Sequence, residues 1–138
     1  MSTSRETKLR IGAFRYLNSL PVLAGLAQVD GKPLPGAPPL RWGSPADCAR
    51  WLATDQINVG LIPSIEYARG AALRYIPDVA ISTERRVRSV VVLSREPLER
   101  CTSIALDATS RTSVALLKIL LRATFTSSLA SRSCLQIR

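Results

Sequence analysis

The sequence predicts an α/β protein whose strands form a parallel sheet, and two patterns carry this prediction. Through the first 70 residues, short apolar stretches typical of buried strands alternate with helical stretches, in the order strand, helix, strand, helix, strand, helix. Each helical stretch has a serine near its start, soon after a strand, where a hydroxyl can cap the helix. Because parallel strands need a crossover between them, this alternation favours a parallel sheet with right-handed crossovers.

Residues 8–14 predict the first strand, since polar and apolar side chains alternate at its start and small apolar ones follow. Asn18 and Ser19 come next as good N-caps, and Pro21 falls where a first-turn proline is tolerated. The apolar face of the short helix predicted here consists of Val22, Leu23, Leu26 and Ala27. Residues 30–39 are rich in glycine and proline, which predicts a surface loop.

The second strand is predicted over residues 40–43, and Ser44 followed by Pro45 is a strong helix start. Asp47 lies near the N-terminus of this helix, where a negative charge suits the helix dipole. We expect the buried stripe to consist of Ala46, Ala49, Leu52 and Ala53, with Trp51 beside it.

The third strand, residues 57–62, is β-branched and mostly apolar, and Pro63 stops its pairing because proline has no N–H to donate. Ser64 is then predicted to cap a helix of one or two turns that ends at Gly70. In open α/β sheets ligands bind beyond the carboxyl ends of strands, and helix N-termini favour anions. An ordinary strand-to-helix turn has the same sequence pattern, so both interpretations stay open on this segment alone.

Shorter elements are predicted after the third helix. Two extended pieces, residues 73–76 and 79–82, flank a turn at Pro77-Asp78. Residues 88–94 are the most strand-like stretch of the chain by their β-branched content. A short helical turn is expected over residues 96–100.

A strand over residues 103–106 leads into a polar loop, residues 107–113, and then into a helix over residues 114–123. The predicted apolar face of that helix consists of Val114, Leu117, Leu120 and Leu121. Four hydroxyls and an arginine converge on its N-terminus, which suits a carboxylate or phosphate, although a plain capping turn is the alternative. The absence of a glycine-rich phosphate loop weighs against a nucleotide. Residues 124–138 are serine-rich and weakly patterned, which predicts a tail without committed structure.

Composition narrows the function classes. The chain has 138 residues, 46% of them hydrophobic, which fits one globular domain with a real core. It contains no histidine, which removes Ser-His and Cys-His catalytic dyads and most zinc sites. Cys48, Cys101 and Cys134 match no metal or redox spacing, so we expect free thiols in a reducing compartment. No apolar run reaches membrane-spanning length and no secretion signal is evident, so we expect a cytoplasmic protein.

The formal net charge of +9 raises the question of a nucleic-acid partner. The arginines are scattered, and only Arg85, Arg86 and Arg88 form a cluster. Aromatic residues make up 5% of the chain and do not interleave with that cluster, so a base-stacking surface is not expected. We therefore predict no nucleic-acid or membrane partner, and the positive charge fits an anionic small molecule equally well.

Four blocks of this sequence, in order and at matching spacing, resemble a known family. They are Tyr-Leu-Asn-Ser-Leu-Pro at residues 16–21, Val-Gly-Leu-Ile-Pro-Ser-Ile-Glu-Tyr-Ala-Arg at 59–69, Val-Arg-Ser-Val at 87–90, and Ile-Ala-Leu-Asp at 104–107 continuing to Ser-Arg-Thr-Ser-Val-Ala-Leu-Leu at 110–117. The chain resembles chorismate dehydratase, the first enzyme of the futalosine route to menaquinone, over residues 8–122.

The resemblance implies a two-lobed α/β fold similar to type II periplasmic binding proteins, with substrate held between the lobes. On this basis residues 1–95 are the N-terminal lobe, 96–123 begin the second lobe and 124–138 are an off-pattern tail. The implied reaction removes water from chorismate and gives 3-[(1-carboxyvinyl)oxy]benzoate, without a metal or organic cofactor. The expected partner is this small-molecule substrate, and the sequence does not give an oligomeric state.

The resemblance also assigns roles to individual residues. Asn18 and Ser89 match positions near the reacting ring and would orient the leaving hydroxyl as catalytic residues. The substrate carboxylates would be bound by Ser19, Ser64, Ser110, Arg111 and Thr112. Without histidine, the base is either a carboxylate such as Glu66 or the substrate's own side-chain carboxylate.

Two features depart from the family pattern. Arg15 stands where a small or polar residue is expected, and its charge would fall near the cleft. Proteins of this family are also considerably longer, so the chain looks like a truncated or frame-shifted product in which the second lobe has only begun. The alternative function is a non-catalytic binding module for a small carboxylate ligand.

Overall fold

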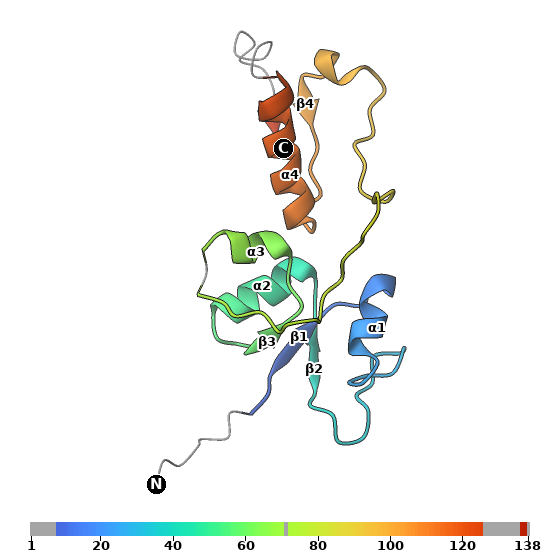
Figure 1. Cartoon of the computed structure of the whole chain (residues 1–138), viewed down its shortest axis with the longest axis vertical. Helices are drawn as coiled ribbons and strands as arrows, with labels where there is room; N and C mark the ends of the chain where they lie inside the picture. The colour runs from blue at the N-terminus through green and yellow to red at the C-terminus, as the bar shows by residue number, and fades with distance from the viewer. Residues whose placement is uncertain (1–7, 71, 126–135, 138) are drawn as a thin grey trace. The chain divides into compact units, whose positions relative to one another are not determined.

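The computed structural model of the chain describes residues 8–70, 72–125 and 136–137 (Figure 1). Contacts divide the chain into an N-terminal unit, residues 1–82, and a C-terminal unit, residues 83–138. The lobe boundary expected near residue 95 stays a prediction. Each unit is described by itself below.

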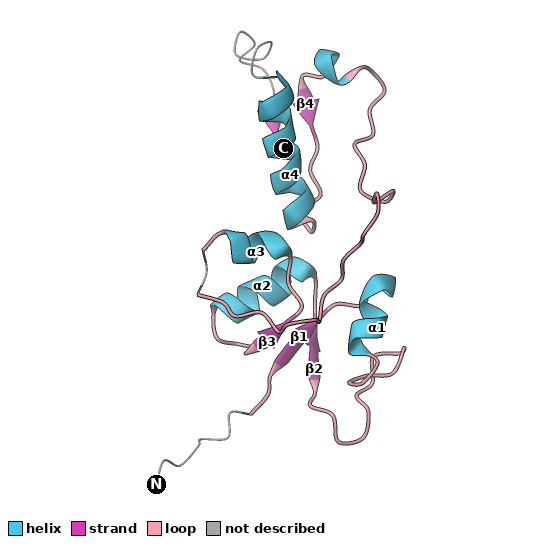
Figure 2. Ribbon diagram, in the orientation of Figure 1, coloured by secondary structure: helices cyan, strands magenta, loops and turns pink. Residues whose placement is uncertain are grey.

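The N-terminal unit is built on a three-stranded parallel sheet, which confirms the predicted α/β class (Figure 2). Its strands are β1 (Ile11–Ala13), β2 (Leu40–Trp42) and β3 (Val59–Gly60), in the order β2-β1-β3. Ile11 of the central strand is aligned with Leu40 on one side and with Val59 on the other. All three strands lie within the predicted stretches, but each is shorter than predicted.

The first helix is shorter than its apolar pattern predicts. A 3-10 turn, η1 (Leu17–Ser19), leads directly into α1 (Leu20–Leu23), with Pro21 in the first turn as expected. The chain then leaves the helix through a turn, and Ala27 forms an isolated antiparallel bridge with Pro33. Gly25 lies in this turn, and glycine is a weak helix former, so the helix ends before the predicted Leu26 and Ala27.

The second helix, α2 (Pro45–Ala53), begins where the sequence predicts, with Ser44 as its N-cap. The predicted buried stripe is confirmed in part: Ala49 is buried, Ala46 and Leu52 are half-buried, and Ala53 is exposed. The centre of the core consists of Cys48, Trp51 and Ile57, and the predicted Leu52 packs against it together with Ile62. The larger side chains are buried because each removes more apolar surface from water than an alanine does.

The third helix, α3 (Ser64–Ala68), follows β3 closely, and Gly70 ends it with a φ of +80°. This left-handed conformation costs glycine little, so the predicted stop at Gly70 is confirmed. Figure 1 shows α2 and α3 together on one side of the three strands and α1 on the other.

The C-terminal unit contains one long helix and a pair of very short strands. The helix α4 (Arg111–Phe125) confirms the prediction for residues 114–123 and extends it at both ends. The 3-10 turn η2 (Leu98–Arg100) precedes β4 (Ser103–Ile104), which pairs in parallel with β5 (Gln136–Ile137). The predicted structureless tail is therefore wrong at residues 124–125, which are helical, and at 136–137, while 126–135 and 138 lie outside the described residues.

The strand predicted over residues 88–94 is wrong, because no strand forms there. Val90, Val91 and Leu93 are 55%, 61% and 88% exposed. β-branched residues favour strands only where a neighbouring strand and a packing surface are present, and no described strand pairs with this stretch. The extended pieces predicted over 73–76 and 79–82 also lack strand pairing, although the turn between them forms at Pro77-Asp78.

Candidate functional site

The carboxyl edge of the three-stranded sheet is the place where most predicted site residues of the N-terminal unit follow a strand. The chain passes from β1 to β2 on one side and then crosses back to β3 on the other, so the topology switches between β1 and β3. Open α/β sheets bind ligands beyond the strand ends at such a switch point. Asn18 and Ser19 follow β1, and Ser64 follows β3, so these three residues flank the switch point.

The turn after β1 is held by the hydroxyl of Ser19. This side chain is fully buried, and its Oγ lies 2.6 Å from the carbonyl oxygen of Phe14 and 2.7 Å from that of Tyr16. The same Oγ accepts a hydrogen bond from the Tyr16 N–H at 3.2 Å. Asn18, one residue earlier, is exposed. The two neighbouring site residues therefore differ completely in access to a ligand.

At the start of α2, after β2, the side chains of Ser44 and Asp47 form hydrogen bonds within the helix N-terminus itself. The Ser44 hydroxyl donates to Asp47 Oδ2 at 2.7 Å, and the Asp47 N–H donates back to Ser44 Oγ at 3.1 Å. The Ser44 hydroxyl most, and then the Ser44 N–H that donates to Asp47 Oδ2 at 3.0 Å, hold the pKa of the Asp47 carboxyl below its ordinary value. A charged carboxylate therefore occupies this helix N-terminus already, and no predicted site residue lies there.

Ser64 is placed differently from the prediction. It is the first residue of α3, and Pro63, in an extended conformation, is the N-cap, so the predicted capping role of Ser64 is wrong. Proline takes this position because its fixed φ suits the residue that precedes the helix, and its carbonyl accepts from the Glu66 N–H at 3.0 Å. Ser64 itself is exposed, so its hydroxyl is accessible to a ligand.

Glu66, a candidate base, and Arg15, the departure from the family pattern, both have partners within the unit. Glu66 Oε1 lies 3.1 Å from the Arg69 guanidinium one helical turn later. The Arg15 guanidinium donates to the Val29 carbonyl at 3.3 Å and lies 5.9 Å from the centre of the Trp42 ring. The charge of Arg15 is therefore held on the loop after α1.

In the C-terminal unit, the predicted Ser110, Arg111 and Thr112 are brought together at the start of α4, and all three are half-buried. The loop before them is folded by Asp107, whose Oδ1 accepts from the Thr109 N–H at 2.8 Å and from the Thr109 hydroxyl at 2.7 Å. These two bonds lower the pKa of the Asp107 carboxyl, the hydroxyl bond most. One of the four hydroxyls predicted to form the cradle is thus used inside the loop.

Ser89, the second predicted catalytic residue, lies neither in the turn after β1 nor at the start of α4. It lies in the exposed stretch that includes Val87 and Leu93, where no helix or strand forms. The structure thus places Asn18 with Ser19 in one turn, and Ser110 with Arg111 and Thr112 where α4 begins. The roles predicted for these residues stay predictions.

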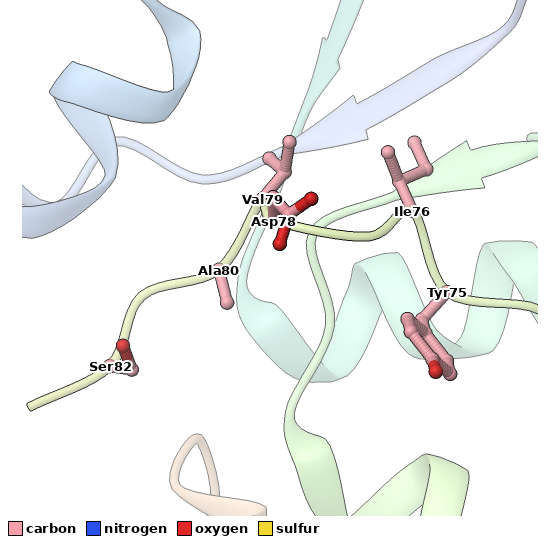
Figure 3. Close-up of a pocket in the computed structure, with 6 residues that line it drawn as sticks. All are labelled: Tyr75, Ile76, Asp78, Val79, Ala80 and Ser82. Carbon is pink, nitrogen blue, oxygen red and sulfur yellow. The ribbon is translucent and has the colours of Figure 1, made fainter.

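A shallow hollow of about 410 Å³ lies along the chain after α3 (Figure 3). Its lining consists of Tyr75, Ile76, Asp78, Val79, Ala80 and Ser82. No predicted site residue lines it, and sequence patterning contained no signal for it. All its walls come from one short stretch of backbone, and its residues are mostly exposed, so it lacks the converging polar groups of a built ligand site.

The described residues provide neither a metal-binding cluster nor a membrane-spanning helix. Among them, no cluster of three or more histidine, cysteine or acidic side chains is arranged to hold a metal ion. None of the helices within these ranges has both the length and the apolar character needed to cross a bilayer.

A known protein family matches most of the chain. Residues 9–134 match the family described as menaquinone biosynthesis. The matched range includes both turns that carry predicted site residues, and it continues past residue 122, where the resemblance in the sequence was expected to end. The chain belongs to the menaquinone biosynthesis family.

Proposed function

We propose that this protein is a chorismate dehydratase, which removes water from chorismate to form 3-[(1-carboxyvinyl)oxy]benzoate. The observation that carries the proposal is the family match over residues 9–134, which contains all four sequence blocks typical of the dehydratase. The family supports a role in menaquinone biosynthesis, and the resemblance of the four blocks to chorismate dehydratase supports the specific reaction. A two-lobed fold similar to periplasmic binding proteins, a carbon–oxygen lyase activity and a cytoplasmic location are parts of the same proposal.

The elimination of water from chorismate mainly requires the protein to position the substrate. The ring hydroxyl leaves with its bonding electrons, the neighbouring ring carbon loses a proton, and these two groups together make the water that is released. The product ring is aromatic, which supplies the driving force. The protein must therefore orient the ring, assist the departing hydroxyl and have a base accept the proton.

Asn18 is the residue best suited to assist the departing hydroxyl. Its side chain is exposed beside the strand-order switch, and its amide N–H groups donate hydrogen bonds to oxygen. Ser64, exposed at the start of α3, is proposed to bind one substrate carboxylate. Ser110, Arg111 and Thr112 are proposed to bind the other, since an arginine beside hydroxyls binds carboxylates well. Ser89 is proposed to act with Asn18 at the ring.

The proposal includes two candidates for the base that accepts the ring proton. Glu66 is a carboxylate two residues after Ser64, and its Oε1 lies 3.1 Å from the Arg69 guanidinium. The substrate's own side-chain carboxylate is the other. A Glu66→Gln variant that keeps full turnover identifies the substrate carboxylate as the base.

The test is an assay of the 138-residue chain with chorismate, with products separated by chromatography and identified by mass spectrometry. A product lighter than chorismate by one water, with an aromatic absorbance spectrum, supports the proposal. A sample without protein measures spontaneous breakdown of chorismate. Calorimetry on the same sample decides the alternative: chorismate binding without turnover indicates a non-catalytic binding module and contradicts the dehydratase proposal.

A further inference from the structure

The hydroxyl hydrogen of Ser19, which a carboxylate ligand would need, is used inside the protein. Its side chain is fully buried, so a substrate carboxylate has no surface of Ser19 to contact. A hydroxyl has one hydrogen to donate, and the carbonyl oxygens of Phe14 and Tyr16 lie within 2.7 Å of it. The Tyr16 N–H donates to the same oxygen at 3.2 Å, so one of its two acceptor lone pairs is used as well.

These bonds fix the turn to the end of the central strand. Backbone bonds hold β1 as far as Ala13, whose carbonyl accepts from the Gly43 N–H at 3.0 Å. Phe14 is the next residue, and its carbonyl is the nearest acceptor to the Ser19 hydroxyl. The Ser19 N–H also donates to the Tyr16 carbonyl at 2.9 Å, which closes the turn on itself. Asn18 lies inside this closed turn, and its position depends on it.

We propose that Ser19 is a positioning residue, which holds the turn so that the Asn18 amide faces the substrate, and that it does not bind the substrate itself. This inference rests on the proposed function insofar as Asn18 assists the reaction. It replaces the carboxylate-binding role that sequence resemblance implies for Ser19. The buried hydroxyl acts through the backbone of residues 14–19, which it ties together.

The first test needs no turnover. In the 138-residue chain, NMR follows the Asn18 side-chain amide signal, assigned by its loss in Asn18→Ala, together with hydrogen exchange at the Tyr16 N–H. We expect Ser19→Ala to shift the Asn18 signal and to speed Tyr16 exchange about tenfold or more, because the turn loses the bonds that close it. Unchanged Asn18 and Tyr16 signals in Ser19→Ala overturn the proposal.

Ser44→Ala is the matched control, because it also removes a serine hydroxyl at the carboxyl edge of the sheet, at the start of α2. It should leave the Asn18 signal in place. If Ser19→Ala does not fold, Ser19→Cys keeps the shape of the side chain with a somewhat larger terminal atom and weakens its hydrogen bonds. The same two NMR signals are followed in that variant.

The second test separates positioning from binding by kinetics with chorismate. A misplaced Asn18 should lower kcat of Ser19→Ala about 100-fold with little change in KM. A raised KM with unchanged kcat means that Ser19 binds the substrate directly, and it overturns the proposal. If the wild-type chain does not turn over chorismate, the proposed function fails by itself, and the NMR result still decides whether Ser19 positions Asn18.

Discussion

Ser44 and Asp47 form a reciprocal pair at the start of α2: the Ser44 hydroxyl donates to the Asp47 carboxylate at 2.7 Å, and the Asp47 N–H donates back at 3.1 Å. The Ser44 N–H adds a third bond to the same carboxylate at 3.0 Å. Two backbone donors at the helix start are satisfied in this way, and the negative charge faces the positive end of the helix dipole.

The pair makes stability depend on pH. Because the pKa of Asp47 is lowered in the folded state, its stabilisation is complete at neutral pH, above the ordinary carboxyl pKa. It is lost as the pH falls through that ordinary value and then through the folded one. Asp47→Asn should therefore lower the free energy of unfolding at neutral pH, and the difference from wild type should shrink in acid.

Urea denaturation of wild type and Asp47→Asn, at neutral pH and again in acid, measures this difference in the free energy of unfolding. The control is Asp78→Asn, since within the described residues Asp78 has no side-chain hydrogen bond and its φ of +60° suits asparagine equally well. An Asp47→Asn difference that is the same at both pH values contradicts the role given to the charge.

The close contact between β1 and the core predicts that a methyl group at Gly12 is poorly tolerated. A Cβ there would lie 2.5 Å from Ile57 Cδ1, and Ile57 is 1% exposed. We expect Gly12→Ala to lower the free energy of unfolding by about 1–3 kcal/mol, typical of overpacking. Gly25→Ala is the control, because nothing lies within 4 Å of its added Cβ.

A double mutant identifies Ile57 as the cause. Ile57→Val removes the clashing Cδ1, and by itself costs about 0.5–1.5 kcal/mol. Combined with Gly12→Ala, it should destabilise by less than the sum of the two single changes. Strict additivity in thermal or urea unfolding would show that the strain at Gly12 arises elsewhere.

Asn18→Ala should abolish turnover of chorismate, with kcat reduced about 100-fold or more, because the departing hydroxyl loses its donor. Asn18 is exposed, so the melting temperature should change little. Gln28→Ala removes another exposed amide of the same unit and should leave kcat unchanged. Full turnover by Asn18→Ala contradicts the assignment.

The exposed apolar stretch after residue 87 predicts self-association. Val90, Val91 and Leu93 are all more than half exposed and carry strand-forming side chains without a paired strand among the described residues. Val91→Lys should lower the fraction of larger species seen by analytical ultracentrifugation. Val29→Lys changes an isolated residue that is 76% exposed, and should have no such effect.

The thiols should differ sharply in reactivity. Cys48 is fully buried, and burial raises the pKa of its thiol to about 11. Cys101 is half-buried, and its Sγ lies 3.2 Å from the Ser94 Oγ. In a Cys134→Ser background, an aromatic disulfide reagent at mildly alkaline pH should label one thiol in the folded chain and the second only after unfolding. Rapid labelling of both thiols contradicts the burial of Cys48.

Elements with local causes could be predicted from the sequence. The start of α2 follows from Ser44 and Pro45, which supply a cap and a preset φ within neighbouring residues. The helix over residues 114–123 follows from its own apolar periodicity. In the candidate site, the same local logic correctly located polar residues after β1, after β3 and at the start of α4.

Predictions of strand pairing and of core residues were less accurate, because they depend on segments that are distant in the sequence. Residues 88–94 have strong strand propensity, but a strand also needs a neighbour, and propensity cannot supply one. The choice of Cys48 and Trp51 over Ala53 for the core depended on β1, whose Gly12 leaves room for large side chains on α2. Local helix periodicity contains no information about that space.

The sequence by itself determined the α/β class, the order of the first strands and helices, and the family of the protein, because these depend on short-range patterns and on matching residue blocks. Only the tertiary structure decided that β1 is the central strand, that Asn18 is exposed and that its neighbour Ser19 is buried. Adjacent residues in a tight turn face different surroundings. Which of them meets solvent is set by the backbone groups that the fold brings around them.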